Sequence, residues 1–89
     1  MSSPENWELK IDASVWKVVK RFPRRDATAI AEVIRLLPDN PYAGDIRKIG
    51  GEEHVWRRRV GSYRISYELY PEQKLIVVFQ VKRRTSNTY

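Results

Sequence analysis

The sequence of 89 residues contains no cysteine and a single histidine, His54. Without cysteine there is neither a disulfide scaffold nor a thiolate metal site, which suits a reducing compartment. A lone histidine also leaves out a paired-histidine metal centre, so we expect no metal and no cofactor. No apolar run approaches the roughly 20 residues of a membrane-spanning helix, and the start, MSSPENWELK, lacks the apolar core of a signal peptide. We therefore expect a single domain over residues 1–89, cytoplasmic and without a membrane partner.

Acidic residues are scarce in the last third of the chain, and this scarcity sets the distribution of charge. Residues 1–55 hold nine Lys/Arg and nine Asp/Glu, whereas residues 56–89 hold eight Lys/Arg with only Glu68 and Glu72. The formal net charge of +6 at pH 7 therefore lies entirely in the C-terminal part. A basic region beside a neutral remainder predicts a localised site for an anionic partner, with nucleic acid the first candidate.

The N-terminal half predicts one strand followed by two helices. Residues 7–11, WELKI, alternate apolar and polar side chains as a half-buried strand does, and Asp12 is suited to cap the next helix with its side-chain oxygen. Apolar residues at helical spacing follow at residues 13–22 and 24–37, each stretch ended by a proline. The expected buried stripes are Val15, Trp16, Val19 and Phe22 in the first helix and Ala27, Ile30, Ile34 and Leu37 in the second. We expect Trp7 and Trp16 in the core and the helices in an antiparallel hairpin.

Towards the C-terminus the apolar pattern changes to period two. It predicts three strands, at residues 56–60, 63–69 and 75–81. Gly61 and Ser62 form a two-residue turn between the first two strands, and glycine at the first central position favours type II′. Residues 39–51 predict a loop with at most a short extended piece. The order β-α-α-β-β-β is typical of an α+β fold, with a helical hairpin packed on one face of a mainly antiparallel sheet.

A two-residue turn fixes the register of a hairpin, and with it the face on which each side chain lies. Arg59 is then directly opposite Arg64, and alternation places on one face Arg57, Arg59, Arg64, Ser66 and Glu68. The other face is hydrophobic except for Arg58, whose side chain we expect to extend to solvent. Opposed like charges destabilise a sheet by up to about 1 kcal/mol, so an outside anion is expected to neutralise them. RNA phosphate fits paired guanidinium groups; an acidic protein or a plain solvated face are the alternatives.

Alternation in the last strand assigns to the core face Leu75, Val77, Phe79 and Val81. It would also direct Arg83 inward, so we expect the strand to end or bend near Lys82. The segment VKRRTSNTY adds Lys82, Arg83 and Arg84 and ends on Tyr89. Cations beside a ring can hold phosphate while the ring stacks on a base. A frayed chain end is the alternative interpretation of Tyr89.

The segments VWRRRVGSYRISYEL, RKIGG and VKRRTSNTY together resemble the RelE/ParE superfamily of bacterial and archaeal toxins from type II toxin–antitoxin systems. Its usual signature is an aromatic residue, an arginine, a Val-Gly-x-Tyr-Arg turn and a Tyr-Glu strand, then a terminal arginine and tyrosine. The resemblance implies a RelE-like fold. In the RelE branch it also implies an endoribonuclease that enters the ribosomal A site and cleaves mRNA without metal, by attack of the 2′-hydroxyl on the adjacent phosphate. The implied partners are a cognate antitoxin, the ribosome and mRNA.

On the matching positions, the resemblance implies a catalytic set of Arg64, Arg83, Tyr89 and Arg59. Arg64 would clamp the phosphate, Arg83 would stabilise charge or protonate the leaving 5′-oxygen, and Tyr89 would stack on or bond the substrate. RNA-binding roles are expected for Arg57, Lys48, Lys82 and Arg84. Arginine is a poor general base. If a proton acceptor is required here, Glu68, His54 or Tyr89 must serve.

Two other functions are compatible with the resemblance. The ParE branch inhibits DNA gyrase through protein contacts and generally lacks the full Arg/Lys/Tyr set. The joint presence of Arg64, Arg83 and Tyr89 therefore favours the RelE branch. However, this chain carries arginines where RelE-type enzymes carry lysines as well. A catalytically degenerate toxin that only binds its antitoxin is the third possibility.

Overall fold

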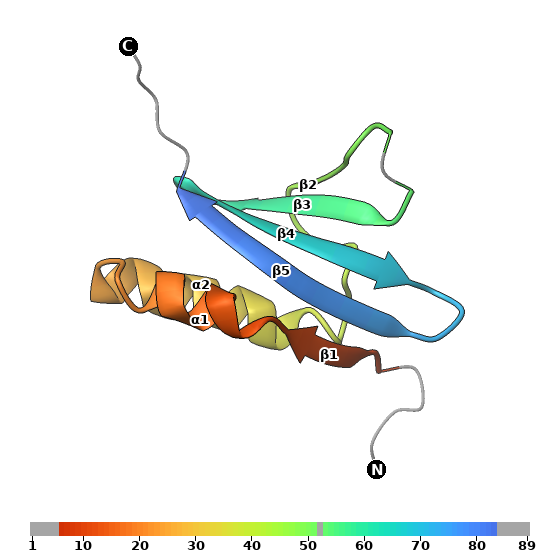
Figure 1. Cartoon of the computed structure of the whole chain (residues 1–89), viewed down its shortest axis with the longest axis horizontal. Coiled ribbons are helices and arrows are strands. Elements are labelled where there is room, and N and C mark those ends of the chain that lie inside the picture. Colours follow the sequence, from red (N-terminus) through yellow and green to blue (C-terminus); the bar gives the residue numbers. More distant parts are fainter. Residues whose placement is uncertain (1–5, 52, 84–89) are drawn as a thin grey trace.

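The computed structural model describes residues 6–51 and 53–83, in which two helices lie on one face of a five-stranded sheet (Figure 1). The elements in chain order are β1 (Glu8–Ile11), α1 (Ala13–Val19), α2 (Arg24–Leu36), β2 (Ile46–Lys48), β3 (Val55–Val60), β4 (Tyr63–Tyr70) and β5 (Leu75–Arg83). The predicted α+β class, with helices covering one face of the sheet, is confirmed. In the part of the chain that the structure describes, no helix is long and apolar enough to cross a membrane.

The strands are arranged in the order β1-β5-β4-β3-β2, with β1 parallel to β5 and every other pair antiparallel. The predicted order β-α-α-β-β-β lacks β2, because β2 lies in the segment that was expected to form a loop. Lys48, which was expected in that loop, is the last residue of β2. The three residues of β2 show no apolar alternation of their own. Pairing with β3 orders them, since Ile46 lies opposite Arg58 and Lys48 opposite Trp56.

The hydrophobic core lies between the helices and the sheet. Its buried members are Val15, Val19, Ile30, Ile34, Leu37, Tyr63, Ile65, Tyr67, Leu69, Ile76, Val78 and Val81. The stripe predicted for α2 is confirmed, and Phe22 and Trp7 are half-buried against the core. Burial of each large aliphatic side chain contributes about 1.5–3 kcal/mol, so this layer supplies most of the stabilisation of the fold.

Two predictions for the first helix are wrong. Trp16 is 40% exposed, because Val15 and Val19 already fill the inward face and the next position is rotated by about 100°. Asp12 occupies the N-cap position, but its side chain makes no capping hydrogen bond. Its carboxylate instead accepts a hydrogen bond from the Ser14 hydroxyl.

The β3–β4 register is the one predicted, with Arg59 opposite Arg64 and Val60 opposite Tyr63. A type II′ turn has a positive φ at its first central residue only. Gly61 has φ +58 and Ser62 does not have a positive φ, so the turn fits this type. The expectation that Arg58 extends to solvent is wrong. Its Nη1 donates a hydrogen bond to the Ala43 carbonyl at 3.0 Å, so the loop before β2 covers the guanidinium group. Its Nε is buried without a hydrogen-bond partner among the described residues.

The alternation predicted for β5 is broken by a β-bulge. Ser66 pairs with Gln80 and Tyr67 with Val78, so Phe79 is an extra residue in β5. The buried residues of the strand are therefore Ile76, Val78 and Val81, and the assignment of Leu75, Val77 and Phe79 to the core is wrong. An inserted residue shifts the phase of the alternation by one, which simple period-two counting misses. The described strand ends at Arg83, one residue beyond Lys82 and thus near the expected end, and Arg83 pairs with Tyr63.

Gly44→Ala should destabilise the fold more than Gly51→Ala. The two glycines have left-handed φ values of +85 and +82, which L-residues adopt at a cost of about 1–2 kcal/mol. A Cβ on Gly44 would also collide with the Arg58 guanidinium group, whereas one on Gly51 meets no described atom within 4 Å. Urea unfolding of both variants, in wild-type and Arg58→Met backgrounds, measures the difference. If the excess loss at Gly44 persists in the Arg58→Met background, contact with Arg58 is not its cause.

Stability should fall at alkaline pH because of one buried phenol. Burial raises the pKa of Tyr67 from 10.0 to about 12, and its hydroxyl donates to the Pro41 carbonyl at 3.0 Å. A raised folded-state pKa stabilises the fold fully below pH 10, and this stabilisation is lost as the pH rises through about 12. Urea unfolding across this window should show the loss in free energy of unfolding. In Tyr67→Phe this alkaline loss should be smaller by up to about 3 kcal/mol. An equal alkaline loss in Tyr67→Phe would assign the effect to other groups.

Candidate functional site

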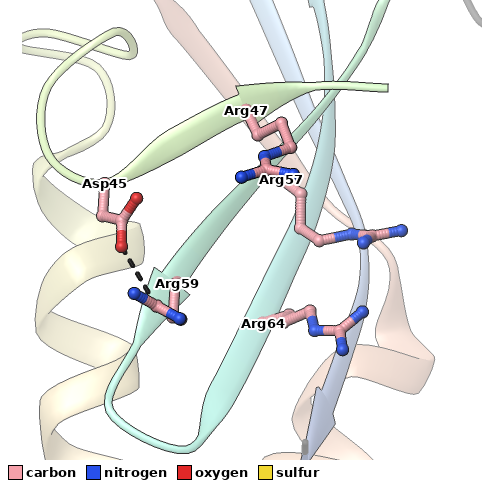
Figure 2. Close-up of a pocket in the computed structure, with 5 residues that line it drawn as sticks. All are labelled: Asp45, Arg47, Arg57, Arg59 and Arg64. Carbon is pink, nitrogen blue, oxygen red and sulfur yellow. Dashed lines mark hydrogen bonds and ion pairs between the residues drawn. The ribbon is translucent and has the colours of Figure 1, made fainter. Parts of the chain in front are cut away.

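Four arginines and one aspartate line a pocket of about 260 Å³ on the face of the sheet opposite the helices (Figure 2). Asp45 precedes β2, and the arginines come from three strands: Arg47 from β2, Arg57 and Arg59 from β3, and Arg64 from β4. Four guanidinium groups against one carboxylate make the pocket strongly cationic. Such a pocket attracts an anionic ligand and concentrates it at the sheet surface.

Strand pairing brings these side chains together in two rows. Arg59 lies directly opposite Arg64, and Arg47 lies directly opposite Arg57. Neighbouring strands are about 4.8 Å apart, and alternate residues on one face are about 7 Å apart along a strand. The structure thus brings together the sequence-predicted Arg57, Arg59 and Arg64 and adds Arg47 to them.

Asp45 explains how two directly opposed arginines are tolerated. Its Oδ2 accepts a hydrogen bond from Arg59 Nε at 3.0 Å, and the Arg59 backbone N–H donates to the Asp45 carbonyl at 2.9 Å. Figure 2 shows the Arg59 guanidinium group turned toward Asp45, while those of Arg57 and Arg64 extend in the opposite direction. The side chains of Arg59 and Asp45 are 53% and 62% exposed. An ion pair this exposed contributes at most about 1 kcal/mol, so another anion can replace the carboxylate.

Sequence reasoning identifies neither Asp45 nor Arg47 as site residues. Both lie in the segment that predicts a loop, and their position depends on the pairing of β2 with β3. The signal that could have found them is the charge pattern of DIRK, in which an acid and a base are two residues apart. In a strand, this spacing places both side chains on one face.

The other predicted cations are placed differently. Lys82 lies directly opposite Arg64 in β5, on the same face of the sheet as the pocket. Lys48 lies opposite Trp56 and lines a separate hollow with Gly50 and Gly51. The predicted residues Arg84 and Tyr89 lie outside the described residues.

Arg83 lies on the helix side of the sheet, away from the pocket. It pairs with Tyr63, a core residue, and its Cζ is 5.9 Å from the centroid of the Tyr63 ring. The Tyr63 hydroxyl donates to Asp26 Oδ2 at 2.8 Å. Burial, together with this hydrogen bond, raises the pKa of Tyr63. The structure therefore does not bring Arg83 together with Arg64.

The candidate proton acceptors His54 and Glu68 belong to a second polar cluster. The Tyr70 hydroxyl donates to Glu68 Oε1 at 3.0 Å, and the His54 and Tyr70 ring centroids are 4.7 Å apart. The hydrogen bond to Glu68 and partial burial raise the pKa of Tyr70. Glu68 is four residues from Arg64 along β4, or about 13 Å, so Asp45 is the carboxylate that lines the pocket. Within residues 6–51 and 53–83, no group of three His, Cys, Asp or Glu side chains could hold a metal ion.

Comparison with solved structures shows where this fold occurs. RelE in the archaeal RelE–RelB complex from Pyrococcus horikoshii OT3 superposes with a TM-score of 0.79 at 24% identity, covering 92% of this chain and 99% of that one. The isolated Escherichia coli RelE toxin gives a TM-score of 0.74 at 14% identity, covering 91% and 87%. At these identities the likeness establishes the fold alone.

Sequence comparison gives the family. A Methanocaldococcus jannaschii protein provisionally named toxin RelE1 is 27% identical over 81 residues, which cover 88% of this chain and 90% of the relative. The family described as ParE toxin of the type II toxin–antitoxin system, parDE, matches residues 10–88. Since that match spans nearly the whole chain, this protein belongs to the RelE/ParE family of toxins of type II toxin–antitoxin systems.

Proposed function

We propose that this toxin is a ribosome-dependent mRNA endoribonuclease of the RelE type, acting in the cytoplasm where ribosomes translate. The observation that carries the proposal is the four-arginine pocket on the uncovered face of the sheet. Guanidinium groups bind phosphate oxygens through charge-assisted, often bidentate hydrogen bonds. The RelE fold of the neighbours supports the proposal, because it belongs to proteins named as RelE toxins.

In the proposed reaction the RNA 2′-hydroxyl attacks the adjacent phosphorus and the bond to the 5′-oxygen breaks, which leaves a 2′,3′-cyclic phosphate and a 5′-hydroxyl. Arg64 and Arg57 extend in the same direction from neighbouring strands. They would bind the non-bridging oxygens and stabilise the charge that builds on them. Groups that are already oriented toward developing charge lower the barrier most effectively, and removing one typically costs 10²–10³ in rate.

Asp45 supplies the proton acceptor that arginine cannot be. A phosphate held between Arg59 and Arg64 competes with Asp45 for the Arg59 guanidinium group, which is now 3.0 Å from the carboxylate. When the phosphate replaces Asp45 as the partner of Arg59, the Asp45 carboxylate is left free beside the bound nucleotide. There it accepts the 2′-hydroxyl proton. Glu68 and His54 are less suited to this role because they do not line the pocket.

Lys82 is the cation best placed to protonate the leaving 5′-oxygen. It lies opposite Arg64 on the pocket face, and an ammonium group can donate a proton. The resemblance assigns this role to Arg83 instead. To reach the same phosphate, Arg83 would have to leave the Tyr63 ring and cross to the other face of the sheet.

A cognate antitoxin is the proposed protein partner, since the Pyrococcus horikoshii neighbour is a RelE–RelB complex. The helices expose three large apolar side chains, Trp16 at 40%, Val18 at 37% and Leu36 at 45%. An amphipathic antitoxin segment could cover them. Acidic residues of the antitoxin would neutralise the arginine pocket whenever RNA does not occupy it.

In vitro translation followed by primer extension on the mRNA tests the proposed function. We expect cleavage only with ribosomes, and a loss of at least about 100-fold in Arg64→Ala. Lys82→Met should lose more activity than Arg83→Met, and Arg35→Ala, on the helix side, should cleave normally. Intact mRNA with blocked gyrase supercoiling would favour the ParE-type function instead, which the ParE family match keeps under consideration. Failure of both activities, with harmless expression of the chain, would indicate a degenerate toxin.

Asp45→Asn should separate binding from cleavage. Loss of the competing carboxylate frees Arg59, so affinity for a 2′-O-methyl oligoribonucleotide, which cannot be cleaved, should rise severalfold. Loss of the proton acceptor should lower ribosome-dependent cleavage by about 100-fold or more. Fluorescence anisotropy and primer extension measure the two effects, with the exposed Asp39→Asn as the matched control. Weaker binding by Asp45→Asn would show that Asp45 positions Arg59 for phosphate and does not compete with it.

A further inference from the structure

Phe79 is a large apolar side chain that the sheet exposes in spite of its sequence context. It lies within the apolar strand β5, yet it is 36% exposed and is not among the buried core residues. Val78 before it is fully buried, and Val81 beyond it is 4% exposed. The bulge lies at this residue: Val78 pairs with Tyr67 and Gln80 with Ser66, so the alternation of β5 shifts by one at Phe79 and Val81 returns to the core. Bulges occur preferentially next to functional sites, where they change the direction of a side chain.

The position of Phe79 relates it to the arginine pocket. Phe79 and Gln80 together oppose Ser66, which is two residues from Arg64 on the pocket face of β4. Lys82, three residues further along β5, lies opposite Arg64. Strand geometry therefore places Phe79 about 10 Å along the sheet from the Arg64–Lys82 pair. Pairing of β1 with β5 ends at Val78, so no described strand pairs with β5 on that side at Phe79.

We propose that Phe79 is a stacking platform for a nucleobase of an RNA strand whose phosphate occupies the arginine pocket. This inference rests on the proposed function and adds a base-binding subsite to it. Proteins recognise single-stranded RNA by stacking bases on aromatic side chains while neighbouring cations hold the backbone. Phe79 beside Arg64 and Lys82 provides both parts of that arrangement on one open sheet face.

The surroundings of Phe79 favour a nucleobase over a protein partner. On the pocket side its neighbours are polar or cationic, namely Gln80, Ser66 and Lys82. The other apolar side chains of this part of the face, Val77 and Leu75, are half-buried. The large hydrophobic residues exposed elsewhere in the described chain belong to the helices or to the loop before β2. A single exposed ring among cations matches a base with its phosphate better than the contiguous apolar patch of a protein interface.

Binding of two uncleavable probes to the purified chain tests the platform. The probes are a 2′-O-methyl oligoadenylate hexamer and an abasic ribose-phosphate hexamer of the same charge. We expect the wild-type chain to bind the adenylate about tenfold more tightly, as base–aromatic stacking predicts. Phe79→Leu should abolish this preference and leave affinity for the abasic probe unchanged, whereas Phe79→Trp should retain it. Val77→Ala, on the same strand and face, is the matched control and should also retain the preference.

The outcomes separate this inference from the proposed function. An unchanged preference for adenylate in Phe79→Leu would overturn the platform, even if ribosome-dependent cleavage is observed. Contact with a protein partner would then be the remaining role for Phe79. Equal loss of affinity for both probes in Phe79→Leu would likewise overturn it, since the base would then contribute nothing specific. If the wild-type chain binds neither probe and cleaves no mRNA, the proposed function fails and the platform fails with it.

Discussion

A shift of one residue in the pairing of β3 with β4 would exchange the two faces of the hairpin. The two-residue turn at Gly61 and Ser62 prevents this shift, and Gly61 supplies the positive φ that the turn needs. The same register places Ile65 and Tyr67 in the core and Arg59 and Arg64 on the opposite face. Burial on one face therefore holds the arginines in place on the other, although the arginines themselves repel.

The repulsion between Arg59 and Arg64 is reduced by a neighbouring carboxylate but is not removed. Asp45 draws the Arg59 guanidinium group away from that of Arg64, and the exposed ion pair is weak enough to exchange. On the other side of β3, the edge strand β2 adds a further arginine, Arg47, to the same surface. The result is a site whose cations are already assembled before an anionic ligand arrives. Arg58 contributes from the other face, where its hydrogen bond to Ala43 ties the loop before Asp45 to the sheet.

The parts of the structure that follow from local periodicity could be predicted from the sequence. These are the α+β class, the inward stripe of α2 and the β3–β4 register, and with that register the grouping of Arg57, Arg59 and Arg64. The parts that depend on tertiary pairing could not be predicted. Strand β2 forms only against β3, so Asp45 and Arg47 were missed, and the bulge at Phe79 changes a phase that counting assumes to be constant. Alternation counted from Val81 does direct Arg83 inward, and the structure places it opposite Tyr63 on that side.

The parallel pairing of β1 with β5 has a consequence for synthesis of the toxin. Strand β5 lies between β1 and β4, so the sheet remains in two pieces until residues 75–83 have been translated. The apolar faces of the helices likewise lack Ile76 and Val78 until that point. A nascent chain therefore cannot complete its fold while most of it is being made. The fold is thus completed only near the end of synthesis, when an antitoxin already present can meet the chain as it closes.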